Sequence, residues 1–119
     1  MTDNIEIVER AFAAYLKQDL ETAQQLYGAD FVFTSPQDDH IDRAAFFERC
    51  FPTSSRVRSQ QLLHVVAADE HNVFVTYQYE LLAGGTFRNT ELITVRDGQL
   101  VETQVFFGGN ALPARSTSG

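Results

Sequence analysis

The spacing of hydrophobic residues in the first part of the chain predicts two helices joined as a hairpin. Asp3 can cap the first helix, and Asp19 can cap the second, which Gly28 can terminate. Apolar residues then form one stripe on each helix. The first stripe comprises Ile5, Val8, Ala11, Phe12, Tyr15 and Leu16, and the second comprises Leu20, Ala23, Leu26 and Tyr27.

A short strand and a third helix are predicted next. Residues 31–35 alternate as a strand, which Pro36 ends because proline cannot donate to a ladder. Residues 37–40 read as a polar loop. Asp42 can then cap a helix over residues 43–51, which Pro52 stops.

From Val57 onward the hydrophobic period changes from helical to two, which predicts strands. Turn signals divide this part into four strands at residues 57–68, 73–82, 86–96 and 99–107. The order of elements predicts an α+β fold, with three N-terminal helices packed in the concave face of a curved antiparallel sheet. We expect residues 1–108 to form a single domain and residues 109–119 to form a flexible tail.

Several of the predicted strands are apolar on both faces. Leu62 and Val66 alternate with Leu63 and Val65, and the last strand shows the same pattern. A sheet with one solvated face does not need two apolar faces. We therefore expect a homodimer that forms through the outer face of the sheet.

Composition excludes several classes of partner. The 119 residues include 9 basic and 16 acidic side chains, a formal net charge of -7, and no basic stripe, so a nucleic-acid partner is not expected. No apolar run is long enough to span a membrane, and no signal region opens the chain. Cys50 is the single cysteine and cannot form an internal disulfide. These features predict a cytoplasmic protein.

Glu91 is the strongest candidate for a functional residue. It alternates with Phe87, Asn89, Ile93 and Val95, so an acid occupies the apolar face of a strand. A carboxylate turned toward a core is costly unless it is paired or protonated, which points to a site formed by Glu91 with Asn89. The alternative is a structural pair, with Glu91 neutralised by Arg49 or by an amide such as that of Asn89.

Acidic residues and a histidine crowd the loop before the third helix. Asp38, Asp39, His40 and Asp42 resemble metal ligands, but Asp42 suits a helix cap and the first two suit a loop. We expect no metal there, and we regard Asp38 and His40 as candidate acid–base groups at a cavity mouth. His64, within an apolar strand, is either structural or catalytic.

Several stretches resemble the nuclear transport factor 2-like, or SnoaL-like, family, a cystatin-like cone fold that also includes ketosteroid isomerase. The similarity lies in Ile7–Tyr15 and Asp19–Glu21 in the first two helices, Ala29–Pro36 in the short strand, and Arg96–Glu102 in the last hairpin. The nearest resemblance is to uncharacterised bacterial members. It implies a cone-shaped pocket for a small molecule and a homodimer, and it implies no established reaction.

The isomerase residues are only partly present. Ser35 stands where the isomerase has its aspartate base, and Ala11 stands where it has the first-helix tyrosine, with Tyr15 one turn further on. Glu91 lies on or next to the position of the oxyanion-hole aspartate, and Cys50 occupies the position of a pocket tyrosine. Steroid isomerisation by the same mechanism is therefore not expected.

The remaining candidates are ligand contacts. Cys50 is either a nucleophile or a small buried hydrophobe, and Arg49 faces either the pocket or solvent. The tyrosines are either core residues or hydrogen-bond donors to a ligand. The full predicted set of ligand-binding residues is Tyr15, Ser35, Arg49, Cys50, Tyr77 and Asn89.

Two functions of different classes fit this pattern. The first is a small enzyme that needs no cofactor and acts on an apolar, oxygenated molecule as an isomerase, dehydratase or hydrolase, with Glu91 as acid or base. The second is a non-catalytic protein that binds a small molecule in the same cavity. The sequence does not decide between them, because this fold hosts many unrelated roles.

Overall fold

The computed structural model describes residues 3–110, and its helices begin where the sequence predicts. Asp3, Asp19 and Asp42 each accept a hydrogen bond from a backbone N–H of the first turn, so all three predicted caps are confirmed. Within the described residues, no helix is long and apolar enough to cross a membrane. The helices are α1 (Asn4–Lys17), α2 (Leu20–Leu26), α3 (Arg43–Arg49) and the 3-10 helix η1 (Phe51–Arg56).

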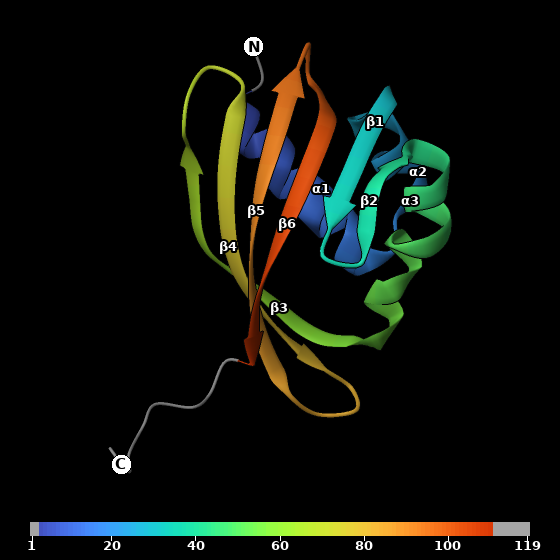
Figure 1. The fold of residues 1–119 in the computed structure, drawn as a ribbon, viewed down its shortest axis with the longest axis vertical. Coiled ribbons are helices and arrows are strands. Elements are labelled where there is room, and N and C mark those ends of the chain that lie inside the picture. Colours follow the sequence, from blue (N-terminus) through green and yellow to red (C-terminus); the bar gives the residue numbers. More distant parts are fainter. Residues whose placement is uncertain (1–2, 111–119) are drawn as a thin grey trace.

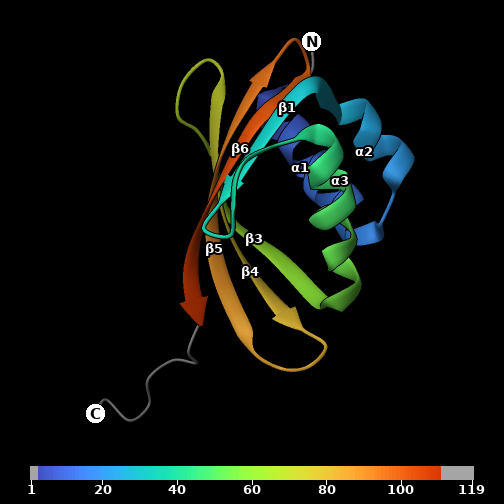
Figure 2. The same cartoon turned by 45° about the vertical axis from the view of Figure 1, so that its right-hand side comes forward.

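One curved sheet carries all six strands, in the order β2-β1-β6-β5-β4-β3. β1 and β6 pair in parallel, and every other neighbouring pair is antiparallel. The helices cover the concave face (Figures 1 and 2), which confirms the predicted α+β fold class. The strands are β1 (Tyr27–Ser35), β2 (Asp38–Asp42), β3 (Val57–Ala67), β4 (Asn72–Leu81), β5 (Thr86–Arg96) and β6 (Gln99–Asn110).

The predicted ends of the second and third helices are wrong. α2 ends at Leu26, and Gly28 lies inside β1, because Tyr27 pairs with Leu100 of β6 and buries its ring in the core. Pro52 does not simply stop α3. It occupies the first turn of η1, where a proline leaves no hydrogen bond unmade.

The predicted polar loop is also partly wrong, because its last three residues, 38–40, lie in strand β2. Val32 pairs with Asp42 across the hairpin of β1 and β2. Ser35 closes the turn, since its Oγ accepts hydrogen bonds from the backbone N–H groups of Gln37 and Asp38 at 3.1 and 3.2 Å. The last strand likewise continues past Phe107 to Asn110, and the rest of the predicted tail, residues 111–119, lies outside the described residues.

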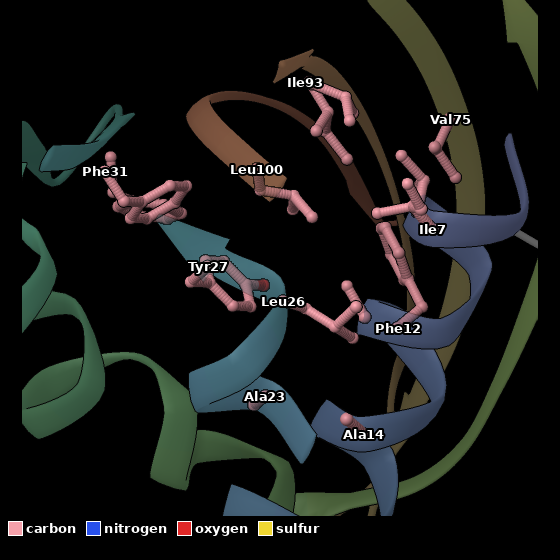
Figure 3. Close-up of a cluster of buried hydrophobic side chains, with 14 of the residues drawn as sticks. Ile7, Phe12, Ala14, Ala23, Leu26, Tyr27, Phe31, Val75, Ile93 and Leu100 are labelled. Carbon is pink, nitrogen blue, oxygen red and sulfur yellow. The ribbon is translucent and has the colours of Figure 1, made fainter. Parts of the chain in front are cut away.

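The core lies between the apolar stripe of α1 and the concave face of the sheet. Figure 3 shows Ile7 and Phe12 pointing toward Val75, Ile93 and Leu100. Each such side chain contributes about 1.5–3 kcal/mol when it is fully buried. A second group of rings, from Tyr27, Phe31 and Phe46, joins α3 to β1 through centroid separations of 4.7–5.1 Å.

The outer face of the sheet carries an apolar patch of Val66, Phe74, Leu92 and Phe106. Val66 pairs with Phe74, and Phe74 pairs with Leu92, so these side chains are neighbours across three strands. Phe106 lies on β6, opposite Thr90. Val66, Phe74 and Phe106 are 41–55% exposed in the isolated chain.

A substitution at Gly108 tests how closely β6 approaches β5. A Cβ at Gly108 would lie 2.5 Å from the carbonyl oxygen of Arg88, whereas one at Gly28 would lie 3.4 Å from its nearest neighbour. We expect Gly108→Ala to lower the free energy of unfolding by about 1–3 kcal/mol, and Gly28→Ala to change it little. Urea denaturation measures both, and equal midpoints for the two variants would contradict the close approach.

Candidate functional site

A cavity of about 650 Å³ lies between the helices and the concave face of the sheet. Its wall combines side chains of α1, α3 and η1 with inward-facing residues of β1 and β3 to β6. Every site residue predicted from the sequence borders it except the two histidine candidates, His40 and His64. Those that do are Tyr15, Ser35, Asp38, Arg49, Cys50, Tyr77, Asn89 and Glu91.

Glu91 projects from β5 into this wall. Its neighbours across the sheet are Val75 on β4 and Val105 on β6, both buried. Burial raises the pKa of Glu91 from 4.5 to about 7, and the hydrogen bond from Tyr77 acts in the opposite direction. Both protonation states are therefore populated near neutral pH.

A chain of hydrogen bonds fixes the orientation of Glu91. Asn89 Nδ2 donates to the Tyr77 hydroxyl at 3.2 Å, and that hydroxyl donates to Glu91 Oε2 at 2.7 Å. Burial, followed by the negative charge of Glu91, raises the pKa of Tyr77, which stays protonated. Because Oε2 already accepts the hydrogen of Tyr77, the titrating proton of Glu91 belongs on Oε1.

The Oε1 atom of Glu91 faces the cavity. It has no hydrogen-bond partner among residues 3–110, yet no fully buried side-chain oxygen or nitrogen in that range lacks a partner. Both facts hold only if Oε1 is accessible from the cavity, and Glu91 is indeed only partly buried. The structural ion pair with Arg49 does not form, since Arg49 instead pairs with Asp38 at 3.6 Å.

All four tyrosines of the chain line the cavity, and they divide into two pairs. Tyr15 and Tyr77 already donate their hydroxyl hydrogens to other side chains of the protein. The Thr53 hydroxyl donates to the Cys50 carbonyl at 2.6 Å, so in the 2.7 Å bond between Tyr15 and Thr53 the phenol is the donor. The hydroxyls of Tyr27 and Tyr79 have no partner among the described residues. Burial raises the pKa of Tyr27, which keeps its O–H as a neutral donor.

Asp38, Arg49 and Cys50 meet at the rim of the cavity. Asp38 lies between the other two, with its carboxylate 3.6 Å from Arg49 and 4.0 Å from the Cys50 thiol. Burial, together with the charge of Asp38, raises the pKa of Cys50 to about 11, despite the opposing effect of Arg49. The thiol is therefore neutral, which fits a small half-buried side chain better than a nucleophile.

The two histidine candidates lie away from the cavity. His40 is mostly exposed on β2, where its Nδ1 lies 2.6 Å from Asp39. His64 is exposed on the outer face of the sheet, opposite Thr76. In the part of the chain that the structure describes, no three His, Cys, Asp or Glu side chains are grouped to hold a metal ion.

The sequence predictions missed Tyr27, Thr53, Arg56 and Gln60, all of which border the cavity. Tyr27 was assigned to the apolar stripe of a helix, and only its pairing with Leu100 shows that it begins a strand. Thr53 and Arg56 lie in η1, where an irregular turn gives no period to read, and Gln60 lies on β3 opposite Tyr79. Pro52 before them was the one available signal of a tight turn.

The sequence matches a known domain family over most of its length. The model of the SnoaL-like domain matches residues 8–103. The chain belongs to the SnoaL-like domain family. The match includes α1 from Val8 onward, the short strand β1 and the cavity wall as far as Thr103 of this SnoaL-like domain. A search of curated proteins finds no match.

Solved structures share the fold of this SnoaL-like domain at low sequence identity. A protein from Kribbella flavida is 21% identical, with a TM-score of 0.78, over 87% of this chain and 84% of its own. A Sinorhizobium meliloti protein provisionally named a polyketide cyclase is 17% identical, with a TM-score of 0.73, over 84% and 93%. A provisional hydroxylase from Streptomyces galilaeus is 16% identical, with a TM-score of 0.68, over 86% and 73%.

The raised pKa of Glu91 gives this SnoaL-like domain a specific pH dependence. Between pH 4.5 and 7 the folded protein holds a proton on Glu91 that the unfolded chain releases. Stability therefore falls as pH rises through this window, by up to about 3 kcal/mol for a group displaced this far. We expect Glu91→Gln to remove that part of the slope and to be more stable than wild type at pH 8.

Denaturant unfolding at several pH values measures this effect. Glu102→Gln is the matched control, because it removes the same charge. Glu102 pairs with Thr94 across the sheet and lies outside the cavity lining. A Glu91→Gln variant that unfolds, or whose stability keeps the wild-type dependence on pH, would show that Glu91 is not a buried acid with a raised pKa.

Proposed function

We propose that this domain binds a small apolar, oxygenated molecule in its cavity and that Glu91 serves as a general acid–base group. The reaction is a proton transfer of the isomerase, dehydratase or hydrolase type and uses no cofactor. The observation that carries this proposal is a carboxyl group with a pKa of about 7, held by Tyr77 with its free oxygen toward the cavity.

The pKa and the geometry of Glu91 suit the same task. A general acid–base group works best when its pKa lies near the operating pH, because both forms are then available. The hydrogen bond from Tyr77 reserves Oε2, so proton exchange with a ligand takes place at Oε1. Asn89 supports this arrangement by donating to the Tyr77 oxygen.

The rest of the lining sets the character of the ligand. Aromatic and aliphatic side chains dominate the wall, which favours an apolar body. The Tyr27 hydroxyl is a free neutral donor for a ligand oxygen, where it would stabilise negative charge that develops during proton transfer. The apolar lining comprises Ala11, Phe12, Phe33, Phe46, Val57, Leu81, Val105 and Phe107.

A non-catalytic binding protein is the second candidate, and Ser35 is the observation that favours it. Ser35 occupies the position of the isomerase base, but its hydroxyl accepts two backbone hydrogen bonds in the β1–β2 turn. That position therefore supplies no base. The provisional cyclase and hydroxylase with this fold are too distant in sequence for their reactions to be transferred.

A proton-abstraction probe distinguishes the two functions. 5-Nitrobenzisoxazole reacts when a base removes its ring C–H proton, the N–O bond breaks, and the electron pair ends on oxygen as a coloured phenolate. We expect wild-type turnover to rise with pH and level off above about 7, and Glu91→Gln to lower it at least ~100-fold. Glu102→Gln should retain the wild-type rate.

Three outcomes would count against this proposal. Saturable binding without turnover above that of Glu91→Gln would favour the binding protein. Full activity in Glu91→Gln would remove Glu91 as the base. Loss of activity in Asp38→Asn, with Glu91→Gln unaffected, would move the base to the rim of the cavity.

We also propose that two copies of the chain associate through the outer apolar patch. Val66, Phe74 and Phe106 are exposed there in one copy, and the face between β3 and β6 is continuous. Burying such a patch against an identical one removes apolar area from water on both sides.

Sedimentation at micromolar concentration tests the dimer. We expect twice the chain mass of 13.4 kDa for the wild type and a shift toward monomer for Phe106→Ser. Leu82→Ser is the matched control, because Leu82 is 55% exposed but follows the end of β4, away from the patch. A monomeric wild type, or equal effects of both variants, would exclude this interface.

A further inference from the structure

Two arginines lie at the mouth of the cavity, and they differ in their partners. Arg49 of α3 is paired with Asp38 at 3.6 Å, so these two charges largely cancel. Arg56, the last residue of η1, has no carboxylate within 4.0 Å among residues 3–110. The cavity mouth therefore carries one uncompensated positive charge.

Arg56 differs from a neighbouring arginine in both its partner and its place. The formal net charge is -7, so acidic partners are plentiful, and Arg58, two residues further on, pairs with Glu80 at 3.8 Å. Arg58 does not border the cavity, whereas Arg56 does. The chain thus leaves a guanidinium unpaired at the entrance of an apolar cavity and pairs its neighbour outside it.

The polar groups of the cavity lining differ in charge. Glu91, which is held by Tyr77, would repel a second negative group once it is ionised. Arg56 is exposed at the end of η1, and the amide of Gln60 on β3 adds N–H donors to the lining. A guanidinium suits a flat oxyanion such as a carboxylate, which it can bind through two N–H groups.

We propose that the natural ligand is an amphipathic anion, with an apolar body in the cavity, an oxyanion group at Arg56 and an uncharged oxygenated end toward Glu91. This inference deepens the proposed function and rests on the cavity as the ligand site, but not on catalysis by Glu91. The overall negative charge of the protein disfavours anions in general, so selection for one comes from this local contact.

Two fluorescent probes that differ by one sulfonate test the proposal. 1-Anilinonaphthalene-8-sulfonate and N-phenyl-1-naphthylamine share the apolar rings and the N–H group, and only the first is an anion. The quantity measured is the ratio of their dissociation constants. We expect Arg56→Gln to reduce the preference for the sulfonate about five-fold, the upper range for a largely solvated ion pair, and added salt to reduce it in the wild type.

Arg58→Gln is the matched control, since it removes the same charge two residues away and outside the cavity lining. We expect it to leave the preference unchanged. An unchanged preference in Arg56→Gln, or an equal loss in both variants, would overturn the anion proposal while leaving the turnover test of Glu91 unaffected.

A further variant separates this failure from failure of the proposed function. Ala11 is buried and borders the cavity, so Ala11→Phe reduces its volume, and circular dichroism checks that the variant folds. Weaker binding of both probes to Ala11→Phe supports the cavity as the site. Undiminished binding of both probes to a folded Ala11→Phe would place them elsewhere and overturn the cavity as the ligand site in both proposals.

Discussion

The contact between α1 and the concave face of the sheet is the constraint on which the rest of the structure depends. Ile7 and Val8 are almost fully buried against the strands, and Ala11 brings the helix close to them. One turn after Ala11, the same face of the helix borders the cavity and carries Tyr15 where the earlier turns carry aliphatic residues. Core and cavity are thus successive parts of one interface, and the helix that stabilises the fold also forms a wall of the site.

Because the core continues into the cavity wall, the carboxyl group of Glu91 lowers the stability of the fold. Its neighbours Val75 and Val105 are core residues, so an apolar side chain at position 91 would simply extend the core. A carboxyl group there is tolerated because Tyr77, itself held by Asn89, donates to one of its oxygens and because it can hold a proton. A domain that keeps such a group is less stable at neutral pH than one with an apolar side chain in its place.

Much of the fold could be predicted from the sequence, because its signals are local. The three aspartate caps and the alternation that turns Glu91 inward depend on residues a few positions apart. The errors concern contacts between distant segments. Tyr27 begins a strand because it pairs with Leu100 of β6. The turn at Ser35 leads into β2, a strand that no alternation of apolar residues predicts. The pairing of Arg49 with Asp38, and the absence of such a pairing at Arg56, likewise require three-dimensional positions.

The place of β6 in the sheet has a consequence for how the chain folds during synthesis. β6 lies between β1 and β5, so it joins the first hairpin of the chain to the later meander. Until the ribosome has released this strand, β1 and β2 can form only a small isolated hairpin, which is marginally stable in water. The helices before and after this hairpin would then keep their apolar faces exposed to water. Such dependence on contacts between distant residues slows folding, and the apolar surface that stays exposed until β6 is in place favours aggregation of the nascent chain.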